Sequence, residues 1–350
     1  MNFAFAQDTL DLRDGARSFL DAENDAARLR DVASGGDRLR LWPKLAEMGL
    51  LGLLAPEAAG GLDLPSEDVL LFCEEVGRAC LPEPFSETAA VLIPALRALG
   101  CPTEAMIEDL VSGARRGIIA HPLNPYPNFA EDADFALAFL PGKVIVSAGE
   151  YIKLTPQQSI DPGRRLCSVT VPFGKIIAKG ELGSQLAANI AARGACAAAA
   201  ELCGLAARMI ELATEYSKVR EQFGQPIGSF QAVKHLMANA QVRLEFARPA
   251  VYRAGTLLNT AGQARDNAVA HAKIAATDAA MLAAENAIQV FGGMGYTFEV
   301  DLHFYMKRVW ALAGIWGDRN YHQKVVDGAV LKRAMPVGPG NTFMQGQSAC

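Results

Sequence analysis

Two stretches of this chain decide its fold: Arg220-Glu221-Gln222-Phe223-Gly224 and Gln289-Val290-Phe291-Gly292-Gly293-Met294-Gly295-Tyr296. Arg220 carries a rigid fork of N–H donors that suits a pyrophosphate group, and Phe223 offers a ring face to an apolar ligand edge. The glycines of the second stretch let the backbone approach a ligand with no Cβ in the way. On these residues alone two interpretations stay open: a ligand site, or a solvated helix end with a glycine C-cap.

Long helical patterns surround both stretches. Apolar residues recur at three- and four-residue intervals in four segments: 185–218, 230–258, 264–291 and one beyond Tyr305. We therefore predict a C-terminal four-helix domain over residues 184–335. The remaining tail, 336–350, is rich in Gly, Pro, Ser and Gln, which indicates a segment that is mobile or docked on a partner.

Helical patterns also fill the start of the chain and predict an all-helical N-terminal domain, residues 1–115. They are separated by short breaks and cover four segments: 16–29, 38–48, 66–78 and 86–99. Ser66 is predicted to begin the third of them, because the acidic Glu67 and Asp68 that follow it favour the positive end of a helix.

The middle of the chain differs in composition from the helical segments on either side of it. Residues 116–183 combine frequent prolines with short apolar runs, of which 135–140 and 143–147 are typical of β-strands. We predict a small β middle domain there. The expected fold class is mainly α: an N-terminal helix bundle, a small β-domain and a C-terminal four-helix bundle.

Composition excludes several classes of function. With 51% hydrophobic and 20% charged residues the chain is expected to be a soluble globular protein. Its net charge of −5, with scattered Lys and Arg, gives no footprint for nucleic acid. No apolar run approaches the roughly 18 residues of a membrane span and no signal peptide is evident, so we expect a cytoplasmic protein without a membrane partner. The seven cysteines and five histidines are too dispersed to predict a metal site.

Three motifs in this order and spacing resemble the acyl-CoA dehydrogenase family. They are the segment 45–62, with its Gly-Leu, Pro-Glu and Gly-Gly pairs, the segment 220–231, and the segment 289–299. The resemblance implies an FAD held across a subunit interface, in which these elements bind the adenosine-pyrophosphate half of the partner's cofactor. The cofactor-binding residues it implies are Arg220, Glu221, Gln222, Phe223, Phe230, Gln231, Gln289, Val290, Phe291, Gly292 and Gly293.

The other half of the family's flavin site has no counterpart. In the family the flavin ring is held by a β-domain loop of the Thr-Glu-Pro and Gly-Ser-Asp type and by a Trp-containing strand. Neither is found between Gly117 and Leu182, and His121-Pro122-Leu123-Asn124-Pro125 at about the right place lacks the hydroxyl and carboxylate pattern.

The family's catalytic base is also missing. Removal of the α proton requires a carboxylate within hydrogen-bond reach. Counted from the glycine motif, the glutamate position is Trp316, and the earlier position that some relatives use is Gly194. Asp318 is a weak candidate for a displaced base, since a shift of two residues redirects the side chain. A helix cap is the expected role of Asp318, and a plug in a vestigial pocket that of Trp316.

These features predict the non-catalytic, FAD-completing subunit of a heterotetrameric acyl-CoA dehydrogenase. Its expected partners are a homologous subunit that supplies the ring site and the base, an acyl-CoA substrate, by analogy a steroid side-chain CoA ester, and an electron-transfer flavoprotein as acceptor. Two alternatives stay open: a homomeric dehydrogenase or oxidase that uses Asp318, and a flavin-free assembly scaffold of the same fold.

Overall fold

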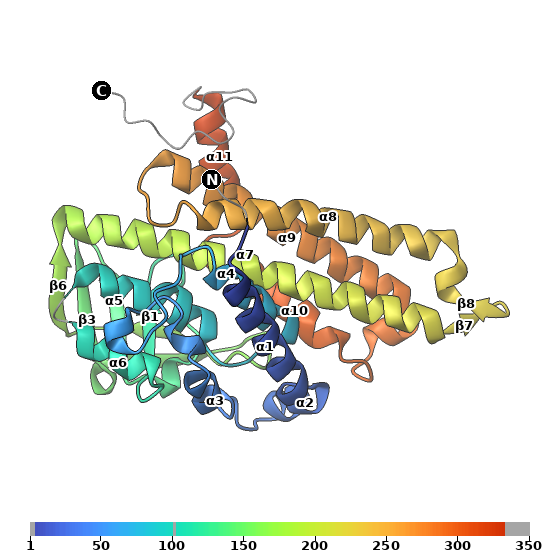
Figure 1. The fold of residues 1–350 in the computed structure, drawn as a ribbon, viewed down its shortest axis with the longest axis horizontal. Helices are drawn as coiled ribbons and strands as arrows, with labels where there is room; N and C mark the ends of the chain where they lie inside the picture. The colour runs from blue at the N-terminus through green and yellow to red at the C-terminus, as the bar shows by residue number, and fades with distance from the viewer. Residues whose placement is uncertain (1–3, 101–102, 333–350) are drawn as a thin grey trace.

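The computed structural model describes residues 4–100 and 103–332 (Figure 1). The predicted tail at 336–350 lies outside the described residues. The N-terminal third is helical, as predicted. Its α-helices are α1 (Gln7–Glu23), α2 (Ala26–Ala33), α3 (Trp42–Glu47), α4 (Val69–Ala79), α5 (Ile93–Leu99) and α6 (Glu104–Val111), and a π-helical turn (Glu87–Leu92) leads into α5.

Local chemistry shifts several helix boundaries from their predicted places. The pattern over 16–29 is broken because Asp25 caps a new helix, its carboxylate accepting a bond from the backbone N–H of Arg28 at 2.9 Å. The third predicted helix begins at Val69 rather than Ser66. The Ser66 hydroxyl makes no cap and instead donates to Asn259 Oδ1 at 3.1 Å, so the side chain joins two distant segments.

The middle segment folds into strands, as its prolines and short apolar runs predict. They are β1 (Gly117–Ala120), β2 (Phe135–Leu140), β3 (Lys143–Ala148), β4 (Lys153–Gln157), β5 (Leu166–Thr170) and β6 (Lys175–Lys179). One sheet has the order β1-β2-β3-β6, parallel between β1 and β2 and antiparallel elsewhere, and β4 pairs with β5 in a separate ribbon. Alternate residues of β2 face opposite sides, with Leu137 in the main core and Ala136 in a smaller cluster.

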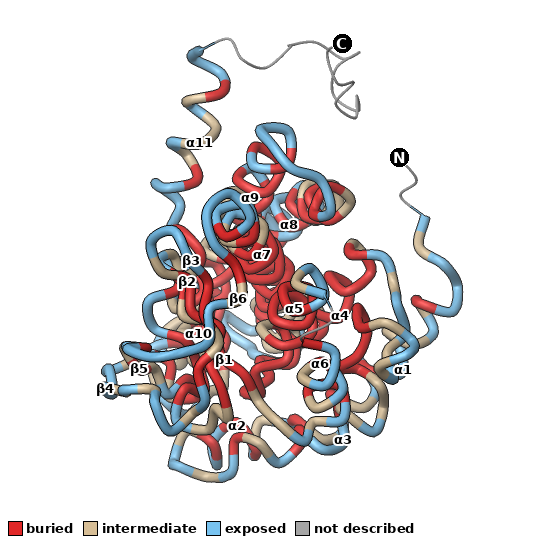
Figure 2. The backbone as a smooth tube through the Cα atoms, turned by 90° about the vertical axis from the view of Figure 1, so that its left-hand side faces the viewer, coloured by how far each residue is buried: buried red, intermediate tan, exposed pale blue. Residues whose placement is uncertain are grey.

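The C-terminal helices differ in direction: the longest run along the long axis of the molecule, and the last projects away from it (Figure 1). They are α7 (Gly180–Val219), α8 (Gln231–Gly255), α9 (Gln263–Phe291), α10 (Leu302–Gly314) and α11 (Arg319–Leu331). α7 packs extensively against α4, α8 and α9. Buried positions gather along α4, α5 and α7 in Figure 2.

Small residues on α7 allow this close packing. A Cβ on Gly204 would lie 1.8 Å from the Glu74 carbonyl oxygen of α4, and one on Gly77 would lie 2.1 Å from the Glu201 carbonyl oxygen of α7. The two helices therefore cross with their backbones almost in contact. One continuous apolar core runs from Ala16 to Trp316, and the domain boundaries at 115 and 183 stay predictions.

By length and composition α7 would pass for a membrane span, since an 18-residue window has a mean hydropathy of 1.4. However, 83% of that window is buried inside the chain, which is the property of a core helix. α7 packs against other helices of this chain, so its apolar composition is no evidence for a membrane partner.

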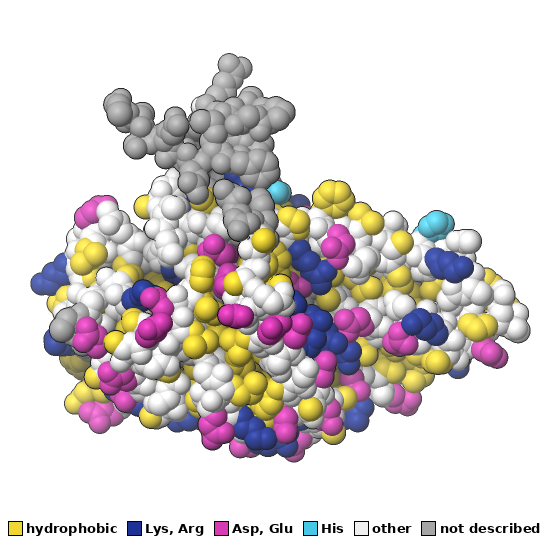
Figure 3. All heavy atoms as spheres, in the orientation of Figure 1, with side chains coloured by type: hydrophobic (Ala, Val, Ile, Leu, Met, Phe, Trp, Pro, Cys, Tyr) yellow, Lys and Arg dark blue, Asp and Glu magenta, His cyan; other side chains and the backbone are white. Residues whose placement is uncertain are grey.

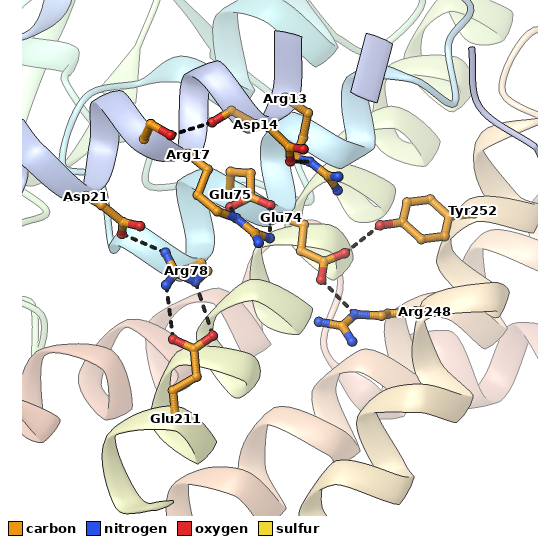
Figure 4. Close-up of polar contacts among 11 residues, drawn as sticks. Arg13, Asp14, Arg17, Asp21, Glu74, Glu75, Arg78, Glu211, Arg248 and Tyr252 are labelled. Carbon is orange, nitrogen blue, oxygen red and sulfur yellow. Dashed lines mark hydrogen bonds and ion pairs between the residues drawn. The ribbon is translucent and has the colours of Figure 1, made fainter. Parts of the chain in front are cut away.

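Ion pairs join α1, α4, α7 and α8 on one side of the core (Figure 4). Arg17 of α1 donates two hydrogen bonds to Glu75, which is buried. Arg78 of α4 reaches both Asp21 on α1 and Glu211 on α7. A third pairing brings Arg248 and the Tyr252 hydroxyl of α8 to Glu74 of α4. These contacts fix the N-terminal helices on the C-terminal bundle.

Candidate functional site

A two-stranded hairpin follows the end of α7. The Arg220 N–H caps the helix by donating to the Tyr216 carbonyl at 2.9 Å, and β7 (Glu221–Gln222) then pairs with β8 (Gln225–Pro226). The turn residues, Phe223 and Gly224, have φ angles of +54° and +78°. Positive φ at both central residues is the twist that a two-residue hairpin requires. The hairpin therefore projects beyond the end of the bundle (Figure 1).

Phe223 occupies a costly conformation at the hairpin tip. Positive φ is unfavourable for a bulky residue, and the Phe223 side chain is 92% exposed. Its only aromatic contact among the described residues is the edge of Phe230, at 6.2 Å between ring centroids. Nothing else in the described chain covers the exposed ring, so the tip is accessible to a ligand or to another chain.

Arg220 is equally free. Its backbone N–H and C=O are both bonded, the C=O to the Ile227 N–H at 2.8 Å. Its guanidinium is exposed and makes no hydrogen bond or ion pair with any residue in the described part of the chain. A cationic fork held by a fixed backbone, with its donors unused, fits a pyrophosphate.

The glycine turn lies beside this hairpin at the same end of the bundle. Gly292 ends α9 with a φ of +61°, and its N–H donates to the carbonyls of Ile288 and Gln289. Phe291 stacks on Tyr216 of α7, with ring centroids 4.3 Å apart and planes at 16°. This stacked pair joins the ends of the two helices and thereby brings the two sequence motifs together.

Most of the predicted cofactor-binding residues are open to solvent. The exposed ones are Arg220, Glu221, Gln222, Phe223, Gln231, Gln289 and Gly293, with Phe230 and Gly292 partly exposed. Val290 and Phe291 are the exceptions, because both side chains are buried in the core. Their side chains support the turn from inside the core, and the prediction that these two residues bind the cofactor stays a prediction. Hydrophobic groups reach the surface along this end of the molecule (Figure 3).

The second region of interest surrounds Trp316, whose side chain is only 2% exposed. Its backbone N–H donates to the Leu123 carbonyl at 2.8 Å, and its own carbonyl lies 3.0 Å from His322 Nε2. A Cβ on Gly194 would lie 2.3 Å from two atoms of the indole ring. The two positions at which a base was expected therefore share one space, and the Trp316 ring fills it.

Buried cations and histidines hold the segment around Trp316. Lys273 Nζ donates to the carbonyls of Leu312 and Ile315, at 2.7 and 3.0 Å, just ahead of the tryptophan. Burial lowers the pKa of Lys273 to about 7. Burial, with a smaller contribution from Lys273, lowers the pKa of His322 to about 4, so the imidazole is neutral and donates from Nε2 to Trp316. No sequence pattern pointed to Lys273 or His322, since each is a lone residue on a long helix.

The segment 121–125, where the family's ring-binding loop was expected, is used to enclose Trp316. The His121 ring lies 5.5 Å from the Trp316 ring, and burial lowers the pKa of His121 to about 4. Asn124 is also buried. The cavity left beside Trp316 and His322 measures about 160 Å³. Pockets for organic ligands typically run from roughly 300 to 1,000 Å³, so little room remains for an acyl thioester.

Asp318 acts as a helix cap. Its carboxylate accepts a hydrogen bond from the Tyr321 N–H at 2.7 Å and begins α11, and the side chain is exposed. This is the role that its place ahead of the helix predicts. The weaker alternative, a displaced catalytic base, has no support in this geometry. The described residues contain no group of His, Cys, Asp and Glu suited to a metal ion.

Two family models match most of the chain: the acyl-CoA dehydrogenase N-terminal domain over residues 6–105 and the acyl-CoA dehydrogenase C-terminal domain over 182–330. The acyl-CoA dehydrogenase IpdE2 of Mycobacterium tuberculosis is 34% identical over 81% of this chain and 84% of its own length. The chain belongs to the acyl-CoA dehydrogenase family. Members of this family are FAD-dependent oxidoreductases, and FAD is the cofactor that the motifs predicted.

Other relatives extend the comparison. The acyl-CoA dehydrogenase FadE34 of M. tuberculosis is 31% identical over 87% of this chain, and the chain spans 45% of the length of that relative. Among solved structures, the ChsE4-ChsE5 complex from M. tuberculosis matches with a TM-score of 0.85 at 21% identity, over 95% of this chain and 99% of the other. The Tcur3481-Tcur3483 steroid ACAD matches with a TM-score of 0.81 at 22% identity, over 94% and 99%. These structural matches confirm the predicted fold.

Proposed function

We propose that this chain is the subunit of a heteromeric acyl-CoA dehydrogenase that completes the FAD site of a homologous partner and carries no catalytic base of its own. The observation that carries the proposal is the contact between Trp316 and Gly194. Neither position can hold a proton, and the indole fills the space that a carboxylate at either would need. The base must then come from another chain.

The retained half-site supports a continuing role in flavin binding. When bound, FAD accepts a hydride from the β carbon of the acyl group while a base removes the α proton. Arg220 would hold the cofactor's pyrophosphate through its free guanidinium, and Phe223 would lie against an apolar edge. Gln289 and the backbone at Gly292 and Gly293 would bind the adenosine side. An assembly scaffold would gain little from keeping the Arg220 motif with an exposed, unpaired guanidinium, which disfavours the flavin-free alternative.

The partner and the substrate class are proposed by analogy with the similar solved structures. A homologous subunit in a heterotetramer would supply the ring-binding loop that residues 117–182 lack, and the similar ChsE4-ChsE5 structure is itself a complex of two components. A CoA ester of a steroid side chain is the proposed substrate class, by analogy with the steroid ACAD. An electron-transfer flavoprotein is the proposed electron acceptor. These steps would take place in the cytoplasm.

The test uses the complex of this chain with the homologous subunit encoded next to it. Arg220→Ala is compared with Arg243→Ala, an exposed arginine on α8 that belongs to neither motif. We expect the purified Arg220→Ala complex to lose most of its flavin absorbance and its dehydrogenase activity together, while the control keeps both. Equal flavin content in the two complexes would contradict the proposal.

A further inference from the structure

A second pocket lies on another side of α7 from the space that Trp316 fills: Arg193 and Arg265 line it, whereas their sequence neighbours Ala192 and Asp266 line the cavity beside Trp316. The volume of this second pocket is about 580 Å³, within the usual range for a small-molecule site. It is enclosed by α5, the first turns of α7, the loop after α8 and the segment around Leu64. Arg193 lines it and lies 27 residues before Arg220 on the same helix, which corresponds to about 40 Å along the helix axis. The two ends of α7 lie far apart in the molecule (Figure 1), and the pocket is therefore separate from the flavin half-site.

Three arginines line this pocket, and two of them already have carboxylate partners. Arg97 pairs with Asp63, and Arg265 pairs with Asp266 at 2.8 Å. Arg265 also donates to a backbone carbonyl and is only 4% exposed. The charges of these two arginines are compensated within the chain.

Arg193 has no such compensation. Its side chain is bonded to neutral groups: Nε donates to Asn189 Oδ1 at 3.0 Å, and Nη2 donates to Asn259 Oδ1 at 2.6 Å and to Ser66 Oγ at 3.3 Å. The residue is 6% exposed, and Nη1 is buried without a hydrogen-bond partner in the described part of the chain. No described Asp or Glu forms an ion pair with it.

A buried, unpaired charge is costly, and native proteins pair almost all of them. Burial, with smaller contributions from the charges of Arg97 and Arg265 and against an opposing one from Cys196, lowers the pKa of Arg193 to about 10. An anion in the pocket would remove this cost by pairing with the guanidinium. The polar ring of Asn189, Asn259 and Ser66 fixes that guanidinium in place for such a ligand.

The remaining walls are partly apolar, and Asp63, which is paired with Arg97, lines the pocket together with Gln185 and Thr260. Leu54, Pro94 and Leu186 line the pocket, and the exposed side chains of Ala98 and Leu182 lie at its mouth. A small inorganic ion would pair with Arg193 and leave these walls against water. A ligand with an apolar body would cover them as well.

We propose that this pocket binds an organic anion, a carboxylate on an apolar body, with the carboxylate paired to Arg193. The proposal does not rest on the flavin role, since it concerns a separate cavity. Such a ligand stabilises the contact between the N-terminal helices and α7, because it bridges α5 and α7 at the pocket walls.

Calorimetric titration of the full chain with cyclohexanecarboxylate tests this directly. Cyclohexylmethanol supplies the same body without the charge, and inorganic phosphate supplies charge without the body. Arg193→Gln removes the guanidinium, Ala98→Trp blocks the mouth and leaves Arg193 intact, and Arg243→Gln is the matched surface control. We expect only the carboxylate to bind, with affinity reduced about tenfold or more in the first two variants and unchanged in the third.

Several results would overturn the proposal. Absence of carboxylate binding, or binding that survives both Arg193→Gln and Ala98→Trp, would mean that the pocket is not its site. Equal affinity for the alcohol would show that binding does not require the negative charge. Equal binding of phosphate would remove the need for an apolar body. Because Ala98 is exposed, its variant folds even where the buried arginine proves necessary for stability, and the pocket is tested in either case.

Discussion

Phe223 and Trp316 share a backbone conformation that aromatic residues rarely adopt, with φ angles of +54° and +56°. Their surroundings are opposite: Phe223 is 92% exposed and Trp316 is 2% exposed. The strain at Trp316 is balanced inside the chain by its packing on Gly194 and His121 and by hydrogen bonds to its backbone. No comparable balance is visible at Phe223 among the described residues. The comparison teaches that the same strained backbone is compensated within the chain at Trp316, whereas at Phe223 the described residues leave the ring open to solvent.

The largest loss in the free energy of unfolding is expected at Trp316. Trp316→Ala removes a fully enclosed ring beside a glycine that cannot fill the space, and we expect a loss of about 3–5 kcal/mol in the free energy of unfolding. Urea denaturation of the isolated chain measures it. Trp310→Ala, on a residue 40% exposed, is the control and should cost much less. Equal losses would show that Trp316 packs no better than a surface residue.

A smaller loss is expected from Gly194→Ala, which drives a methyl group into the indole ring. We expect about 2–3 kcal/mol, since overpacking forces the ring to shift. Gly15→Ala, in α1 where nothing lies within 4 Å, is the matched control and should gain about 0.5–1 kcal/mol. In a Trp316→Ala background the cost at Gly194 should largely disappear. Additive losses would mean that the two positions do not share one space.

Acid should destabilise the region around Trp316. His121 and His322 both have pKa values of about 4 in the folded chain, below the ordinary value of 6.5. The unfolded chain therefore takes up protons first, and stability falls as the pH drops from 6.5 towards 4. We expect a loss on the order of 1–3 kcal/mol from this pair between about pH 6.5 and 5.5. His322→Gln, which can still donate to the Trp316 carbonyl, should flatten the dependence. An unchanged pH profile in that variant would exclude His322 as a source.

The smallest effect on the free energy of unfolding is expected at the exposed hairpin tip. Phe223→Asn places Asn before Gly224, the pair that a two-residue hairpin favours, and should raise the free energy of unfolding by about 0.5–1 kcal/mol. In the complex the same change should weaken flavin retention, because the aromatic surface is gone. Thermal unfolding and flavin absorbance measure the two effects. A variant that is more stable and keeps its flavin would deprive Phe223 of a functional role.

Local signals made much of this predictable. The long helices and the strands at 135–140 and 143–147 follow from hydrophobic periodicity and short apolar runs. The resemblance located Gly194 and Trp316 separately, but their contact spans 122 positions of sequence and has no local signature. Burial of Phe291 depends on Tyr216 of another helix. Arg193 lies within an Ala-rich helix, where nothing in the pattern distinguishes a buried guanidinium from a solvated one.

The central claim is that this chain provides one half of a flavin site, and an FAD titration tests it most directly. Flavin fluorescence is followed as FAD is added to this chain alone, to the homologous subunit alone, and to an equal mixture of the two. The account predicts tight binding in the mixture, with fewer FAD molecules than chains, and none retained by this chain alone. Stoichiometric binding of FAD by this chain alone would contradict it.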